Sequence, residues 1–274
     1  MAFVNFQGRK FHYQLFKQEG GANLPLVFVH GLACTHEDWA LQVDFFKSHH
    51  SVVTCDLPGH GLSDPPADGG SIESCSAALT SLLTHLDLPP AVLIGHSMGC
   101  RVILQTAIDA PRRVAKLILV DGSRVAEGDP QEVERQVRQH IADVGYASMM
   151  EALFSEMFVD GRDPDSKERL IRRALALPEK TGTSLFAGMA RWDAGKADAA
   201  LARINVPTLV LQSTYLNTER VRVPLQPGED TPWMRLVHDR VKDAALAVIS
   251  GVGHFSMLEA SDDVNERIRA FVDK

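Results

Sequence analysis

The sequence predicts an α/β protein: a mostly parallel sheet flanked by helices, with a helical insertion. Three observations lead to this fold class. Apolar runs typical of strands buried on both faces alternate with helical patterns. This alternation stops between residues 122 and 203, where only helical patterns occur. Finally, a Gly-x-Ser-x-Gly string, Gly95 to Gly99, stands between an apolar run and a helical pattern.

Length and composition indicate an ordinary globular protein. The 274 residues are 45% hydrophobic and 23% charged, which is ample for one large core. A net charge of −7 without a basic patch argues against a nucleic-acid partner. No apolar run approaches the roughly 20 residues that cross a bilayer, and the first ten residues lack a signal-peptide pattern, so no membrane partner is expected. Four cysteines without C-x-x-C spacing favour a cytoplasmic location.

The first half of the chain alternates between strand and helix patterns. An antiparallel pair is predicted first, over residues 3–6 and 11–16, because side chains there alternate around a turn at Gly8. Continuous apolar runs then predict buried strands for 25–29, 52–55, 91–94 and 114–120. Helices are predicted for 39–47, 72–86 and 101–109.

The second half begins with the insertion. Helices over 132–144, 149–158, 165–177 and 183–192 predict a helical cap, or lid, at 123–203, inserted into a core domain of 1–122 and 204–274. Alternation then resumes with a strand at 207–212, an irregular stretch at 213–232, a helix at 233–241, a strand at 246–249 and a helix at 262–272.

The serine of the Gly-x-Ser-x-Gly string has a physical reason to be reactive. At a sharp strand-to-helix turn, Ser97 is held in strained backbone geometry with its side chain exposed. The backbone N–H of Met98 points near the same space. The side chain of His96 is expected to point the opposite way.

Several motifs occur together in one order. The first is the turn Gly95 to Gly99 after the third parallel strand, which we call the elbow. The others are His30-Gly31-Leu32 after an early strand, the loop Asp56 to Ser63, which reads D-x-x-G-x-G-x-S, and Gly251-Val252-Gly253-His254 after the last strand. With these, the chain resembles the α/β-hydrolase family over all but the middle of the cap. The resemblance implies an eight-stranded, mostly parallel sheet.

The resemblance also implies site roles. Ser97 would be the nucleophile and His254 its general base, because a serine hydroxyl needs an imidazole to take its proton. The backbone N–H groups of Leu32 and Met98 would form the oxyanion hole. Asp56 and its loop are expected to be architectural.

The acid that orients His254 is not determined by the motifs. The turn after the strand at 207–212, where the family usually carries an aspartate, contains none. Asp121 ends the strand after the elbow, where some family members carry the acid, and is favoured for that reason. Glu219 and Asp230, in the long stretch that follows, remain candidates.

Aromatic residues of the cap, together with Trp39 just after the turn of Leu32, suggest an apolar pocket over Ser97. Trp39, Phe154, Phe158 and Trp192 are the predicted lining residues, since ligand sites favour domain interfaces. Arg220 and Arg222 could meet an anionic substrate group, although a solvated surface is the favoured interpretation.

These observations predict a serine hydrolase that cleaves a small hydrophobic ester, thioester, lactone or C–C bond through an acyl-enzyme. Two alternatives remain open: a cofactor-independent dioxygenase on the same fold, and a non-catalytic small-molecule receptor. No metal is expected, because no histidine pair has ligand spacing, and no cofactor, because no phosphate-binding loop follows the early strands. The oligomeric state is not predicted.

Overall fold

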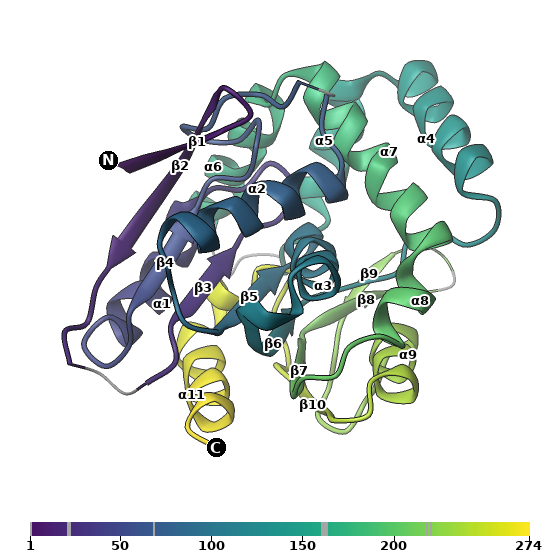
Figure 1. Ribbon diagram of the computed structural model, residues 1–274. Coiled ribbons are helices and arrows are strands. Elements are labelled where there is room, and N and C mark those ends of the chain that lie inside the picture. The colour runs from purple at the N-terminus through teal and green to yellow at the C-terminus, as the bar shows by residue number, and fades with distance from the viewer. Residues whose placement is uncertain (1, 21–22, 68, 160–163, 218, 220) are drawn as a thin grey trace.

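The computed structural model describes residues 2–20, 23–67, 69–159, 164–217, 219 and 221–274. Its centre is an eight-stranded sheet in the order β1-β2-β4-β3-β5-β6-β7-β10 (Figure 1). β2 runs antiparallel to β1 and β4, and all later neighbours are parallel. The predicted fold class is confirmed. Strand bounds are Ala2–Phe6 (β1), Arg9–Phe16 (β2), Leu26–Val29 (β3), Val52–Cys55 (β4), Ala91–His96 (β5), Val114–Val120 (β6), Thr208–Gln212 (β7) and Ala244–Val248 (β10).

Helices cover the sheet because its central strands have no polar face. Every residue of β3, β4 and β5 is buried, as expected for parallel strands with both faces covered. α2 packs against α3, and α1 against α11 (Figure 1). Bounds of the core helices are His36–Trp39 (η1), Ala40–Phe46 (α1), Ile72–His85 (α2), Met98–Asp109 (α3), Pro111–Arg113 (η2), Pro232–Arg240 (α9), Ser256–Glu259 (α10) and Ser261–Val272 (α11).

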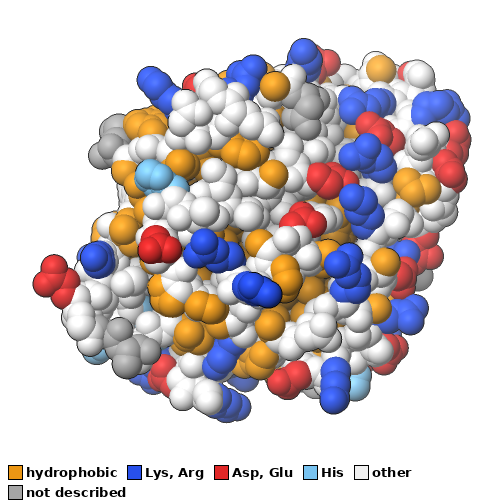
Figure 2. Space-filling model, in the orientation of Figure 1, with side chains coloured by type: hydrophobic (Ala, Val, Ile, Leu, Met, Phe, Trp, Pro, Cys, Tyr) orange, Lys and Arg blue, Asp and Glu red, His pale blue; other side chains and the backbone are white. Residues whose placement is uncertain are grey.

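Five helices stand between β6 and β7. They are Pro130–Val144 (α4), Tyr146–Ser155 (α5), Pro164–Ala176 (α6), Glu179–Gly195 (α7) and Ala197–Leu201 (α8), and no strand interrupts them in the described parts of this segment. α4 packs on α7, and α5 on α6. Basic and acidic side chains interleave over α4 and α7 at the upper right of Figure 2. That residues 123–203 form a separate cap stays a prediction.

The stretch predicted to be irregular contains a small hairpin. β8 (Thr214–Leu216) pairs antiparallel with β9 (Arg222–Pro224), outside the main sheet. The expectation of irregular structure is wrong here because three-residue strands are too short for their periodicity to be recognised. The hairpin brings the chain back to the loop after β10, where the N–H of Gly251 donates to the carbonyl oxygen of Leu225 at 3.1 Å.

In the described residues, no helix combines the length and apolar character that a bilayer crossing requires.

Candidate active site

Ser97 lies at a strained turn between β5 and α3. Its backbone has φ 53° and ψ −112°, in a region that residues with a side chain rarely adopt. The flanking glycines are closely surrounded: a Cβ on Gly95 would lie 2.5 Å from the carbonyl oxygen of Gly99, and one on Gly99 would lie 2.4 Å from that of Val29. The backbone therefore has the sharp strand–turn–helix shape that the sequence predicts.

His254 lies in the loop after β10, beside this turn. Its ring is buried, and the ring centroid is 4.9 Å from that of His96. His96 Nε2 donates to the carbonyl oxygen of His254 at 2.9 Å, and the N–H of His254 donates to the carbonyl of Met157 at 2.6 Å. The fold thus brings His254 next to the elbow, although no hydrogen bond joins its side chain to that of Ser97 in the described chain.

The group that contacts the His254 ring is a guanidinium. Arg222 Nη1 lies 3.3 Å from His254 Nδ1 and donates to Thr214 Oγ1 at 3.0 Å. Because a guanidinium can only donate, Nδ1 accepts, and the neutral ring carries its hydrogen on Nε2. The solvated surface expected for Arg222 is wrong: β9 places the residue half-buried against His254. Arg220 lies outside the described residues.

Burial and this contact both favour the neutral form of the imidazole. Burial, followed by Arg222 and His96, holds the pKa of His254 well below its ordinary value. Two like charges about 4 Å apart repel by on the order of 4 kcal/mol at an effective dielectric constant of about 20. The imidazolium that a general base must form is therefore disfavoured while the guanidinium stays in place.

Arg222 itself lacks a countercharge. Burial lowers the pKa of Arg222, and the more distant Asp121 and Glu156 act to raise it. Among the described residues, no carboxylate forms an ion pair with this guanidinium. Buried or half-buried charges are normally paired, so this arrangement is unusual.

Asp121 is buried at the end of β6 among serines. Its Oδ1 accepts from the N–H of Ser213 at 2.7 Å and lies 2.6 Å from Ser213 Oγ, while Oδ2 accepts from Ser256 Oγ at 2.6 Å. Ser213 Oγ also lies 2.5 Å from the carbonyl oxygen of Gly253, the residue before His254. Asp121 is thus connected to the backbone of the histidine loop, but no described hydrogen bond joins it to the imidazole.

Burial raises the pKa of Asp121 to about 6, even though hydrogen bonds from Ser213 and Ser256 act to lower it. Its role as the acid stays a prediction. Sequence reasoning did not identify Ser213 and Ser256, because single serines carry no motif.

The other two acid candidates lie on the surface. Glu219 is exposed, and its backbone N–H donates to Asn217 Oδ1. Asp230 is exposed and pairs with Arg235. Neither carboxylate bonds His254 in the part of the chain that the structure describes.

The two predicted oxyanion donors lie on neighbouring turns. A Cβ on Gly31 would lie 3.2 Å from the Cβ of Ser97, so the turn that carries Leu32 borders the elbow. The N–H of Leu32 has no backbone partner among the described residues, and Met98 opens α3, where N–H groups lack intrahelical partners. Their role as oxyanion donors stays a prediction.

A residue of α6 holds the turn after Leu32. Arg173 Nε donates to the carbonyl oxygen of Ala33 at 2.9 Å, and Nη1 donates to Thr35 Oγ1 at 3.0 Å. Nη2 pairs with Asp38 Oδ2 at 2.5 Å. Ala33 has φ 54°, so these bonds fix a strained turn. Nothing in the sequence marks Arg173, because its partners lie about 140 positions away.

The four predicted pocket residues are buried. Phe158 stacks on Phe255, next to His254, with ring centroids 5.0 Å apart, and Phe154 lies 6.2 Å from the same ring. The other two contact core residues: Trp39 lies 5.0 Å from Phe28, and Trp192 Nε1 donates to Gln105 Oε1 at 2.8 Å. Their role in lining a substrate pocket stays a prediction.

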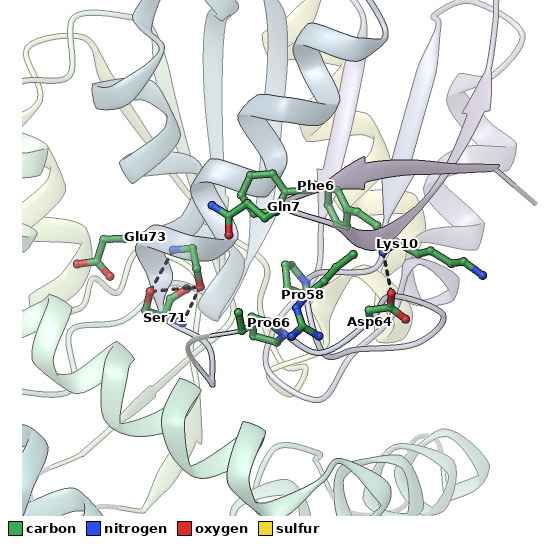
Figure 3. Close-up of a pocket in the computed structure, with 12 residues that line it drawn as sticks. Phe6, Gln7, Lys10, Pro58, Asp64, Pro66, Ser71 and Glu73 are labelled. Atoms are coloured by element: carbon green, nitrogen blue, oxygen red, sulfur yellow. Dashed lines mark hydrogen bonds between the residues drawn. The ribbon is translucent and has the colours of Figure 1, made fainter.

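A surface pocket of about 340 Å³ lies elsewhere. The turn between β1 and β2, the loop after β4 and the start of α2 line it (Figure 3). Figure 3 shows Asp64 bonded to the backbone of Lys10 at its edge. None of the predicted site residues lines this pocket.

One cluster offers three possible metal ligands, His12, His36 and Asp56, whose ligand atoms lie within 4.8 Å of one another. These atoms already bond each other: Asp56 accepts from His12 Nδ1 at 2.9 Å and from His36 Nδ1 at 2.8 Å. The N–H groups of His36 and Leu62 also donate to Asp56. These bonds connect the loop after β4 to β2 and to the start of η1.

Comparisons with known proteins agree with this fold. A model described as the alpha/beta hydrolase family matches residues 26–267. The dihydrolipoyllysine-residue acetyltransferase component of the acetoin cleaving system of Pseudomonas putida is 26% identical over 94% of the chain, which spans 66% of that protein. The (E)-2-((N-methylformamido)methylene)succinate hydrolase of Acinetobacter baylyi is 24% identical over 93% of the chain and 92% of that protein.

The enol-lactonase of Burkholderia xenovorans LB400 shares the fold, with a TM-score of 0.80 at 19% identity over all of both chains. Its likeness concerns the fold alone, but family and relatives together indicate a hydrolase enzyme. The chain belongs to the alpha/beta hydrolase family.

Proposed function

We propose that the protein is a serine hydrolase whose nucleophile is Ser97 and whose general base is His254. The observation that carries this proposal is the strained φ of 53° at Ser97, at a turn that also borders the histidine loop and the turn of Leu32. Strain of this kind is kept where it serves function. The substrate is a small hydrophobic ester, thioester, lactone or molecule with a cleavable C–C bond.

The reaction follows from the residues in place. Ser97 Oγ attacks the substrate carbonyl carbon and gives its proton to His254 Nε2, which can accept it once the ring carries its own hydrogen on Nδ1. The N–H groups of Leu32 and Met98 hold the oxyanion, and His254 then protonates the leaving group. Water hydrolyses the acyl-enzyme by the same route in reverse. Asp121 acts as a positioning residue, through Ser213 and Ser256, on the loop that carries His254.

A fluorophosphonate probe tests the proposal, with the adduct mapped by mass spectrometry. We expect a single adduct on Ser97. Ser97→Ala should abolish it, and His254→Ala should slow labelling at least about 100-fold, because general-base catalysis contributes roughly that much. Ser148→Ala, on the exposed side of α5, is the matched control and should label like wild type.

Absence of labelling in folded wild-type protein would contradict the proposal. Two rival functions would then be measured directly: oxygen uptake with aromatic substrates for a cofactor-independent dioxygenase, and ligand binding without turnover for a receptor.

A further inference from the structure

We infer that the substrate carries an anionic group, such as a carboxylate, and that this group releases His254 by drawing Arg222 away from it. The inference rests on the proposed function and names its substrate class. It starts from the one guanidinium described at the histidine ring, Arg222, whose Nη1 lies 3.3 Å from His254 Nδ1.

The contact leaves the imidazole in the wrong tautomer for serine attack. Because Arg222 can only donate, Nδ1 accepts and Nε2 carries the hydrogen. A base toward Ser97 needs the reverse: hydrogen on Nδ1 and a lone pair on Nε2. The free protein therefore holds its catalytic base in an inactive form.

The same guanidinium is available to an anion. Its described hydrogen bonds reach only Thr214 Oγ1, at 3.0 Å, and His254, both through Nη1. A guanidinium has five N–H donors, so a carboxylate could be bound by two parallel bonds from the remaining ones. Phe158 stacks on Phe255, and the Phe255 ring lies 5.9 Å from that of His254, so the surroundings of the histidine are apolar and would suit the apolar part of such a substrate.

Binding of the substrate anion and release of His254 follow from one change of partner by Arg222. The anion pairs with the guanidinium, which turns from Nδ1 and loses its effective positive charge at the ring. His254 then takes a hydrogen from water on Nδ1 and gives up the one on Nε2, so that no net proton is gained. The Nε2 lone pair now faces the proton of Ser97. A neutral substrate or probe supplies no such pairing, so it reacts slowly, only with the minor fraction of molecules in which Arg222 has already left Nδ1.

Two matched esters test the inference: 4-nitrophenyl hydrogen glutarate, which is anionic, and 4-nitrophenyl hexanoate, which is neutral and similar in length. Wild type should favour the glutarate in kcat/KM. Arg222→Met should lower kcat/KM for the glutarate by about 30-fold or more, the value of a charge-assisted pair. The same variant should raise kcat for the hexanoate several-fold, because the base is no longer blocked.

Arg222→Lys should keep part of the preference, since the charge remains and the planar fork is lost. Arg203→Met, an exposed arginine with no described side-chain partner, is the control and should leave both esters unchanged.

Equal losses on both esters in Arg222→Met would overturn the inference, because a merely structural arginine acts without regard to substrate charge. No change on either ester would overturn it too. Fluorophosphonate labelling of each variant separates the two proposals: labelling at Ser97 without charge preference rejects only the anionic substrate, whereas no labelling rejects the serine hydrolase.

Discussion

Two buried aspartates follow parallel strands in the same way and differ in their chemistry. Asp56 ends β4, and Asp121 ends β6; neither side chain is exposed. Burial acts to raise the pKa of Asp56, but hydrogen bonds from His36, the nearby His30 and a bond from Leu62 outweigh it and hold the pKa far below the ordinary range. Burial raises the pKa of Asp121 to about 6, because the hydrogen bonds from Ser213 and Ser256 that act to lower it do not outweigh burial.

The difference teaches that the donors around a buried carboxylate, together with its depth, decide what it can do. Asp56 is surrounded by N–H groups and imidazoles that need its negative charge, so it serves as a structural centre. Asp121 has hydroxyl neighbours that can donate or accept. Ser213 Oγ has one hydrogen but lies within 2.6 Å of both Asp121 Oδ1 and the Gly253 carbonyl. A proton on Asp121 would satisfy both contacts at once.

The largest expected effect is on stability at Asp56. Asp56→Asn should cost about 3 kcal/mol or more, because an amide cannot accept from all the donors that now converge there. Urea unfolding measures this, with the exposed Asp44→Asn as a control that should change stability by less than about 0.5 kcal/mol. A cost below about 1 kcal/mol would remove the contrast between the two aspartates.

The second effect is on reactivity at Asp121. Asp121→Asn should slow fluorophosphonate labelling of Ser97 by about 100-fold, since the histidine loop loses the group that positions it. Asp56→Asn, assayed under conditions where it is folded, should label within about threefold of wild type. If both variants lost reactivity equally, the division into structural and functional aspartates would be wrong.

The third effect is a pH dependence of opposite sign at the two positions. Asp121 has a folded pKa of about 6 against about 3.9 unfolded, so its contribution to stability is full below pH ~4 and is lost as the pH rises to ~6. Asp56 has a lowered pKa, so its contribution is present above pH ~4 and is lost as the pH falls.

Urea unfolding at pH values from about 3.5 to about 7, in steps of about half a unit, would resolve the two slopes of stability against pH. The stability difference between wild type and Asp121→Asn should fall by about 2 kcal/mol with rising pH. The difference for Asp56→Asn should fall with decreasing pH. Parallel slopes would show that the two carboxyls titrate alike.

The smallest expected effect separates the two serines of Asp121. Ser213→Ala removes the connection to Gly253 and should slow Ser97 labelling about tenfold, with about 1 kcal/mol of stability lost. Ser256→Ala removes a similar bond to Asp121 without touching Gly253, so it should cost similar stability and less reactivity. Equal labelling rates in the two variants would rule out positioning through Gly253.

Local pattern was sufficient for most of the fold. Continuous apolar runs predicted β3 to β7, because strands buried on both faces need apolar side chains at every position. Helical spacing predicted α4 to α7, because a helix buried along one side repeats its apolar residues about every 3.6 positions. Short elements without a period, β8, β9, α8 and α10, could not be recognised.

The site was predictable only as far as its motifs extend. The elbow and the histidine loop are each a continuous stretch of sequence, so their residues could be named from the motifs. In the structure the two stretches lie side by side. Arg222 contacts His254, and Ser213 contacts Asp121, across long separations in sequence, and such contacts leave no local spacing by which to recognise them. For the same reason, the sequence left three acids open.

Arg173 connects α6 to the turn after Leu32, so any movement of α6 would also disturb that turn. If α6 swung outward, the turn would lose three side-chain bonds at once, to Ala33, Thr35 and Asp38. The N–H of Leu32, a proposed oxyanion donor, would then no longer be held in place. In the serine hydrolase that we propose, oxyanion binding would thus depend on the position of α6, so a molecule with α6 displaced would react more slowly with substrate and with water alike.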